Sequence, residues 1–237
     1  SSIDSLTHYM KFLNTGSLSL DPHSGAVKTW IGGVDFEHFK YDHVAQSKRQ
    51  VGSTFKPFVY TAALEVGIEP CTYFSAEEVE YENLKGWSPS NSGDKDEAYL
   101  NYSMEEALSN SVNTVAVKVL EETGINNVLT MAKNMGIFTE LPNQPSVALG
   151  TGEIYLNELA GAYASYLNKG RAVLPYFIKT IADKKDSVLV EFEPKRAVEP
   201  AYSEQTRQIM VEMMKSTIDK GTASRLRSTY KLNNAIA

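Results

Sequence analysis

The sequence of 237 residues contains one cysteine, Cys71, which excludes both an intramolecular disulfide and a cysteine-rich metal site. It has no run of about 18 apolar residues of the kind that spans a membrane. Residues 1–15 also lack the basic and then apolar layout of a signal peptide. Basic residues are not in excess, because 23 Lys and Arg stand against 29 Asp and Glu, a net charge of −6. We therefore expect no binding of nucleic acid through its phosphates.

Motifs that mark several common enzyme classes are also absent. The sequence has no Walker loop, no HExxH and no GxGxxG. Its four histidines have no spacing typical of metal ligands, and we interpret them as surface residues: His8, His23, His38 and His43. Sequence alone leaves a Ser-His-Asp triad open, but none of these histidines lies in a typical catalytic context. We therefore expect any nucleophile in this chain to use another base.

What is present is the composition of an ordinary globular domain, with 42% hydrophobic and 22% charged residues. The length allows one large domain or two small ones. No internal repeat or low-complexity tract is visible. We interpret residues 1–16 as a linker, with a short amphipathic helix as the alternative, and residues 17–237 as one domain.

Apolar periodicity predicts a helix-rich chain with few strands. Runs that flank turn residues predict two hairpins, one from residues 17–20 and 26–31 and one from residues 176–182 and 188–193. Residues 34–52 are interpreted as irregular and residues 68–102 as a long surface connection. Helices are predicted, in order, near residues 53–66, from the capping box at 103–106 onward, and at 114–122, 126–135, 156–167 and 204–218.

The pattern Ser-x-x-Lys puts a serine hydroxyl and a lysine amine within reach on one face of a helix. It occurs three times, about as often as chance would deliver it, at Ser53/Lys56, Ser92/Lys95 and Ser228/Lys231. Only Ser53 lies where a glycine turn enters an apolar-striped helix. The other two pairs lie in polar surroundings, and we interpret them as solvated residues.

The position of Ser53 has chemical consequences. A serine at the start of a helix lies beside unpaired backbone N–H groups and the positive end of the dipole, which favour developing negative charge. Its own N–H could serve as one oxyanion donor. Desolvation would lower the pKa of Lys56 and let its amine accept the hydroxyl proton. The alternative is that Ser53 is an N-cap and Lys56 a surface residue, and this segment alone leaves the two interpretations equal.

A second polar signal is Ser111-Val112-Asn113, a short polar run between two apolar helices. Such a run suggests side chains directed into a cleft, where the hydroxyl of Ser111 could relay a proton and the amide of Asn113 could hold a substrate amide. The alternative is that the segment caps the helix that starts near Thr114. Both interpretations fit the sequence.

Taken together, these segments resemble a known family. RQVGSTFKPFVY at residues 49–60 closely resembles the active-serine segment of the penicillin-binding proteins, specifically the transpeptidase domain of the bifunctional class A group. Further segments recur in the family's order: LDPHSGAV at 20–27 followed by GG at 32–33, WSPSN at 87–91, ALSNSVN at 107–113, ALG at 148–150, AYA at 162–164 and KGTA at 220–223. The ordered set covers most of the chain and is more specific than any one member.

The resemblance implies an α+β fold of the penicillin-binding-protein and serine β-lactamase type, helix-rich with an antiparallel sheet, and no metal or organic cofactor. It implies that Ser53 attacks the penultimate D-Ala carbonyl of a peptidoglycan stem peptide ending in D-Ala-D-Ala, with Lys56 activating the hydroxyl. Ser111 would pass a proton to the leaving amine, and Asn113 would position the acyl side chain. A neighbouring stem amine would then complete the D,D-transpeptidase reaction, whereas a β-lactam antibiotic would acylate Ser53 and remain.

The resemblance also implies a location on the extracytoplasmic face of the bacterial membrane, with a membrane anchor and a glycosyltransferase domain preceding Ser1 in the full-length protein. Two alternatives stay open. One is a hydrolase on the same scaffold, a D,D-carboxypeptidase or a β-lactamase. The other is a noncatalytic module that recognises penicillin.

The family's third motif, Lys-Thr/Ser-Gly, does not occur in this sequence. KTW at 28–30 and KTI at 179–181 lack its glycine, which lets the backbone of a strand approach the substrate closely. In the family this motif follows shortly after the segment that KGTA resembles. We therefore expect that the chain, which stops at Ala237, is cut short before that strand, and that by itself it lacks the site for the substrate carboxylate and the second oxyanion donor.

Overall fold

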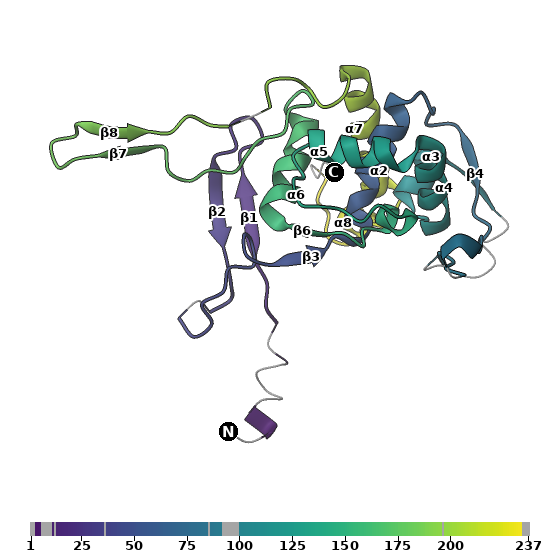
Figure 1. Ribbon diagram of the computed structural model, residues 1–237, viewed down its shortest axis with the longest axis horizontal. Coiled ribbons are helices and arrows are strands. Elements are labelled where there is room, and N and C mark those ends of the chain that lie inside the picture. Colours follow the sequence, from purple (N-terminus) through teal and green to yellow (C-terminus); the bar gives the residue numbers. More distant parts are fainter. Residues whose placement is uncertain are drawn as a thin grey trace.

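The computed structural model of the chain describes residues 3–5, 11, 13–35, 37–84, 86–91, 100–195 and 197–233, apart from the side chain of Asn83. Half of residues 1–16 lies outside these ranges, so the division into a linker and a domain stays a prediction. The described part is a helical body with one β-hairpin beside it and a second hairpin that extends away from it (Figure 1).

The helical body is built around α2, Lys56–Glu65, which packs mainly against three other helices. These are α4 (Asn113–Thr123), α5 (Ile125–Asn134) and α7 (Glu204–Asp219). The other helices and helical turns are α3 (Met104–Ser109), α6 (Leu156–Tyr163), α8 (Arg225–Ser228), η1 (Gly52–Phe55), η2 (Glu82–Leu84), η4 (Pro145–Leu149) and η5 (Ala164–Leu167). All the predicted helices are present with ends shifted by a few residues, and α8 is an addition.

Helix α2 is covered on every side by the rest of the body, so all of residues 56–63 are buried. The predicted stripe is buried over most of its length: Phe55, Phe58, Val59, Ala62 and Ala63. Pro57 is tolerated because it lies in the first turn, where its missing N–H is not needed. The last predicted position, Val66, is exposed instead, because the helix ends at Glu65 and the chain turns at Gly67 with a φ of +93°.

Strands occur as short antiparallel pairs in the part of the chain that the structure describes. The two predicted hairpins are confirmed as β1 (Ser17–Leu20) with β2 (Val27–Ile31) and β7 (Thr180–Ala182) with β8 (Val188–Glu191). Two further pairs are β3 (Lys48–Gln50) with β6 (Glu153–Tyr155) and β4 (Tyr73–Ser75) with β5 (Asn101–Ser103). The interpretation of residues 34–52 as wholly irregular is therefore wrong, because β3 leads directly into η1.

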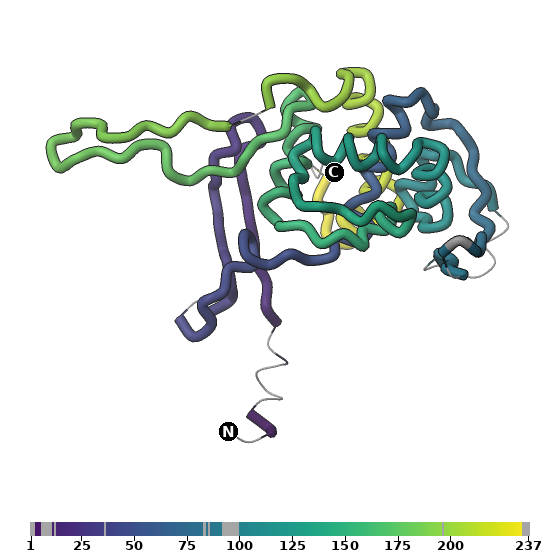
Figure 2. The backbone as a smooth tube through the Cα atoms, in the orientation of Figure 1, coloured from purple at the N-terminus to yellow at the C-terminus, as the bar shows by residue number. Residues whose placement is uncertain are grey.

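The hairpin of β7 and β8 extends from the helical body as an arm (Figure 2). Every residue of its two strands is exposed. Its base is connected to the first hairpin, where the N–H of Val27 donates to the carbonyl of Tyr176 and the rings of Trp30 and Phe177 meet edge-on. Among the described residues, no helix has the length and apolar character needed to cross a membrane.

Gly150, directly after η4, makes a backbone hydrogen bond with the first residue of η1. It has a φ of +70°, and its carbonyl accepts the N–H of Gly52 at 3.1 Å. A Cβ on residue 150 would overlap the backbone carbonyl of Gly52. Glycine is therefore required at position 150 by the close approach of the two backbones as well as by the φ angle.

Replacing Gly150 with alanine is expected to lower the free energy of unfolding by about 1–3 kcal/mol or more, as is typical of overpacked sites. Gly67→Ala is the matched control, because Gly67 also has a positive φ, but nothing lies within 4 Å of a Cβ placed there. Urea unfolding of both variants measures the difference. Equal losses would show that the contact with Gly52 contributes nothing beyond backbone strain.

Candidate active site

Lys56 is the first residue of α2, and its side chain is only 1% exposed. The alternative interpretation of Lys56 as a surface residue is therefore wrong. Its Nζ donates to the carbonyl oxygen of Ser111 at 2.6 Å, to the hydroxyl of Ser111 at 2.9 Å and to Oδ1 of Asn113 at 2.7 Å. The structure thus brings together three of the four predicted site residues, across 55 and 57 positions of sequence.

Burial lowers the pKa of Lys56 to about 8, because an ammonium that is removed from water loses its hydration. Among the described residues, no charged side chain contributes to this shift. The amine is therefore still mostly protonated at pH 7, but it loses its proton far more readily than a surface lysine. A group with such a pKa is suited to accept a proton near physiological pH.

The three hydrogen-bond partners fit both protonation states of the Lys56 amine. The carbonyl of Ser111 and Oδ1 of Asn113 only accept, whereas the hydroxyl of Ser111 can accept or donate. An ammonium uses all three as acceptors. A neutral amine can keep its two N–H donors on the carbonyl and the amide and accept a hydrogen bond from the hydroxyl. The site therefore allows Lys56 to lose and regain a proton without leaving a buried polar group unpaired.

Ser53 lies in η1, three residues before Lys56, and its side chain is exposed. The N-cap of this turn is Val51, and no side chain caps it. The alternative interpretation of Ser53 as an N-cap is therefore wrong. In the part of the chain that the structure describes, no hydrogen bond joins the Ser53 hydroxyl to Lys56, Ser111 or Asn113. Ser53 presents its hydroxyl to solvent at the start of the helix that carries the buried amine.

The backbone of this turn is also fixed from α6. The hydroxyl of Tyr163 donates to the carbonyl of Thr54 at 2.6 Å. Pro57 has no N–H, so it cannot supply the donor that a 3₁₀ turn would give to the carbonyl three residues earlier. The ring of Tyr163 meets the ring of Phe58 edge-on, with 5.7 Å between centroids. The exposed side chain of Ser53 is therefore carried by a backbone that two contacts hold, one with Gly150 and one with Tyr163.

Ser111 lies in the turn between α3 and α4 with a φ of +57°, a left-handed conformation that few residues other than glycine adopt. This turn is supported by the segment after α7. The N–H of Thr222 donates to the carbonyl of Ser109 at 3.1 Å, and a Cβ on residue 221 would overlap the same oxygen. Gly221 is therefore needed for the close approach of this segment to the end of α3.

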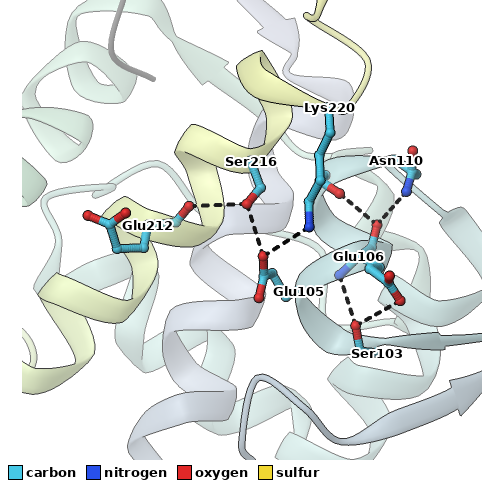
Figure 3. Close-up of polar contacts among 8 residues, drawn as sticks. Ser103, Glu105, Glu106, Asn110, Glu212, Ser216 and Lys220 are labelled. Carbon is cyan, nitrogen blue, oxygen red and sulfur yellow. Dashed lines mark hydrogen bonds and ion pairs between the residues drawn. The ribbon is translucent and has the colours of Figure 1, made fainter.

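Polar contacts fix α3 against α7 on the side shown in Figure 3. Oε1 of Glu105 accepts from the hydroxyl of Ser216 at 2.9 Å and from Nζ of Lys220 at 3.5 Å. The predicted capping box is present in modified form. Oγ of Ser103 accepts from the N–H of Glu106 at 3.3 Å, but the Glu106 carboxylate accepts from the Ser103 hydroxyl rather than from its N–H. These contacts fix the first turn of the short helix that leads to Ser111.

Helix α4 is capped by a residue that sequence reasoning missed. Its N-cap residue, Val112, makes no side-chain hydrogen bond, so the alternative that the Ser111–Asn113 segment serves as the cap is wrong. Instead, Oδ1 of Asn91 accepts from the N–H of Asn113 at 2.9 Å and from that of Thr114 at 3.1 Å. Rules for capping relate neighbouring residues, and no such rule connects positions 22 residues apart.

The other Ser-x-x-Lys pairs do not form a comparable site. Ser228 is exposed at the end of α8, where its hydroxyl donates to the carbonyl of Ser224 at 3.2 Å. Lys231 is exposed as well. The pair Ser92/Lys95 lies outside the described residues.

The prediction that the histidines are surface residues is wrong for one of them. His23 and His38 are exposed, and His8 lies outside the described residues. His43 is only 9% exposed, because Phe39 and Tyr41 pack against its ring. In the described part of the chain, no hydrogen bond joins His43 to Lys56, Ser111 or Asn113.

Comparison of the sequence with known proteins finds similar proteins. The sequence model of the family described as penicillin binding protein transpeptidase domain matches residues 17–233. Penicillin-binding protein 1A of Pseudomonas aeruginosa is 37% identical over 183 residues, which cover 76% of this chain and 22% of that protein. Penicillin-binding protein 1A of Aquifex aeolicus is 33% identical over 214 residues, which cover 89% of this chain and 29% of that protein. The chain thus spans less than a third of the length of these relatives.

Solved structures share the fold. The crystal structure of penicillin-binding protein 1A from Haemophilus influenzae matches with a TM-score of 0.82 and 25% identity, covering 91% of this chain and 38% of that chain. The structure of PonA1 from Mycobacterium tuberculosis, in complex with penicillin V, matches with a TM-score of 0.72 and 22% identity, covering 91% of this chain and 60% of that chain.

Proposed function

Since this chain belongs to the family of penicillin-binding protein transpeptidase domains, we propose that it carries a serine D,D-transpeptidase site that cross-links peptidoglycan stem peptides. Its relatives confirm the resemblance to the class A group, and the solved structures confirm the predicted α+β fold. The observation that carries the proposal is the buried amine of Lys56, which is held by Ser111 and Asn113 at the start of α2, directly after a turn with the exposed Ser53.

In the acylation step, Oγ of Ser53 attacks the carbonyl carbon of the penultimate D-Ala and passes its proton to the neutral Nζ of Lys56. The bond from that carbonyl carbon to the nitrogen of the terminal D-Ala then breaks. Nζ of Lys56 returns a proton to the hydroxyl of Ser111, 2.9 Å away, and this hydroxyl gives its own proton to the leaving amine. The products are free D-Ala and an ester on Ser53.

In the second step, the amine of a neighbouring stem peptide attacks the ester, and the same groups return the proton to Ser53. Asn113 has Oδ1 on Lys56 and one amide hydrogen on the carbonyl of Ser90, at 2.7 Å and 2.9 Å. Its second amide hydrogen remains for a carbonyl of the substrate. This supports a role for Asn113 in substrate binding in addition to its contact with Lys56.

Transfer and hydrolysis share the ester on Ser53 and differ in the group that attacks it, an amine or an activated water, so the fate of the ester decides between them. The lowered pKa of Lys56 supports a catalytic module rather than one that only recognises penicillin, because a buried amine of this kind is costly to keep without a chemical use.

The proposed reaction also implies where the site acts and which further parts the full-length protein has. Peptidoglycan lies outside the cytoplasmic membrane, so we place the site on the extracytoplasmic face. A membrane anchor and a glycosyltransferase domain in the full-length protein are part of the proposal, in keeping with the greater length of the relatives. The partners are stem peptides ending in D-Ala-D-Ala, with β-lactam antibiotics as inhibitors.

The experiment that tests the proposal treats the full-length protein with a fluorescent penicillin and maps the adduct by digestion and mass spectrometry. We expect one covalent adduct, on the peptide that contains Ser53. An adduct on another residue, or none on the folded protein, would contradict the proposal. Release of the label within seconds would favour a β-lactamase. Release of D-Ala from a stem peptide without cross-linked product would favour a carboxypeptidase.

The rate of acylation is expected to rise with pH, with a midpoint near the pKa of Lys56 at about 8, because the neutral amine is the base. The same shift affects stability. The ordinary pKa of a lysine is 10.5, so between about pH 8 and 10.5 the unfolded chain binds more protons than the folded one. The contribution of Lys56 to the free energy of unfolding therefore increases with pH over this range. Acylation rates that stay constant from about pH 6 to 9.5 would reject Lys56 as the base.

A further inference from the structure

The segment before residue 92 makes a dense set of contacts with the start of α4. Oδ1 of Asn91 accepts two backbone N–H groups, from Asn113 and Thr114, and Nδ2 of Asn91 donates to Oγ1 of Thr114 at 3.1 Å. The carbonyl of Ser90 accepts from Nδ2 of Asn113 at 2.9 Å. Oγ1 of Thr114 in turn donates to the carbonyl of Ala76 at 3.0 Å. Five residues from three segments thus share one hydrogen-bonded network.

This network replaces the cap that α4 lacks. The first N–H groups of a helix have no acceptor within the helix. Val112, at the N-cap, has an apolar side chain and cannot supply one. The amide oxygen of Asn91 takes this role for the N–H groups of the first two helical residues. The start of α4 therefore depends on a residue that belongs to another segment of the chain.

The same segment sets the orientation of the Asn113 amide. A backbone carbonyl can only accept, so the carbonyl of Ser90 must face the nitrogen of that amide rather than its oxygen. The oxygen is then turned toward Nζ of Lys56, at 2.7 Å. Exchange of the two ends of the amide would break both contacts. The loop therefore determines which atom of Asn113 faces the lysine.

We infer that Asn91 is a positioning residue that acts through Asn113 on the Lys56 amine, by holding the backbone start of α4 in register with the amine. This inference rests on the proposed function of Lys56. Among the described residues, no hydrogen bond joins Asn91 to Lys56. Its effect on acylation is transmitted by two hydrogen bonds, from Asn91 to the N–H of Asn113 and from Nζ of Lys56 to Oδ1 of Asn113.

Asn91→Ala removes the acceptor of both N–H groups. It is expected to slow acylation by a fluorescent penicillin at least tenfold, whereas the affinity for the penicillin before acylation should change less. The matched control is Ser203→Ala. Ser203 caps α7, where its Oγ accepts from the N–H of Thr206 at 3.1 Å, so its loss weakens a helix of the same body far along the chain from Lys56. We expect Ser203→Ala to lose comparable stability and to acylate at the rate of the wild type.

Asn91→Asp separates positioning from simple stability. Its carboxylate still accepts both N–H groups, so acylation is expected to return to within about threefold of the wild type at high pH. The added negative charge favours the ammonium of Lys56. The pH midpoint of acylation should therefore move upward whatever the role of Asn91, because the charge acts on Lys56 through space. The rate above that midpoint is the decisive result, because the inference predicts that it recovers when both N–H groups keep their acceptor. If Asn91→Ala fails to fold, this rate in Asn91→Asp decides the question.

The inference is overturned if Asn91→Ala acylates within twofold of the wild type, if Ser203→Ala is slowed as much as Asn91→Ala, or if Asn91→Asp stays at least tenfold slower than the wild type at high pH. Its failure is distinct from failure of the proposed function. If the wild type forms no adduct on Ser53, the proposed function fails. If the wild type is acylated and the Asn91 variants behave like it, only the role of Asn91 is rejected.

Discussion

Replacing Ser53 with alanine is expected to abolish covalent labelling by a fluorescent penicillin. The other hydroxyl of this turn, Oγ1 of Thr54, donates to the carbonyl of Val51 at 2.6 Å and is not expected to replace that of Ser53. Loss of the nucleophile in a serine enzyme costs on the order of 10⁶-fold in rate. The side chain is exposed and makes no hydrogen bond to the buried amine, so the free energy of unfolding should change by no more than about 0.5 kcal/mol. Gel fluorescence after denaturation measures the label, and urea unfolding measures the stability.

The chain offers a matched control for this variant. Ser228 also precedes a lysine by three residues, and it is exposed in a short helix, but Lys231 is exposed rather than buried. Ser228→Ala is expected to label like the wild type. Equal labelling of Ser53→Ala and the wild type would show that another residue is the nucleophile. Loss of labelling in both variants would point to a general effect on folding, which the unfolding curve would reveal.

The part of the site that the sequence predicts is the part that local rules describe. The apolar stripe after Phe55 predicts α2, and this helix fixes the spacing of Ser53 and Lys56. The polar run at Ser111 and Asn113 stands out because the helices on both sides of it are apolar. Each of these signals lies within about ten residues, where helix periodicity and capping rules apply.

The burial of Lys56 lies beyond such rules. Whether a lysine in the first turn is exposed depends on which element covers it, and the covering residue, Ser111, is 55 positions away. The spacing alone therefore left the buried amine and the surface residue as equal alternatives. The resemblance to a family favours one of them, but only the folded chain shows the three contacts of the amine.

Two structural features could not be predicted because their signal is divided between distant segments. Strand β3 has three exposed polar residues and no alternation, and it forms because β6 pairs with it. The cap of α4 comes from Asn91, which in sequence is only a polar residue in a long connection. Gly150 is a similar case, because its requirement arises from the backbone of Gly52 rather than from its own turn alone.

These distant contacts converge on the same small region. The turn with Ser53 is held by Gly150 and Tyr163, and the turn with Ser111 is approached by Gly221. Each of these contacts fixes backbone rather than side chain. The reactive groups can therefore keep their freedom to exchange protons while their relative placement is set by the surrounding body, which is what preorganised catalysis requires.

Replacing Lys56 with methionine is expected to slow acylation by at least 100-fold, in line with losses of about 2.7–4 kcal/mol for removal of a catalytic donor. Methionine keeps most of the apolar volume of the side chain but can neither accept the proton of Ser53 nor donate to Ser111 and Asn113. The residual rate should also lose its rise near pH 8, because that rise belongs to the lysine amine. Acylation rates over a pH series measure both effects.

The stability of Lys56→Met should change much less than its rate. Loss of three hydrogen bonds destabilises the fold, but removal of a buried cation stabilises it, so the two effects oppose each other. Lys118→Met is the matched control, because Nζ of Lys118 also donates to backbone carbonyls, those of Ser75 and Glu77, and desolvation lowers its pKa as well. We expect this control to be acylated at the rate of the wild type. If Lys56→Met keeps a normal rate with a normal pH profile, another group deprotonates Ser53, and the buried amine serves only to hold α2 against the turn before α4.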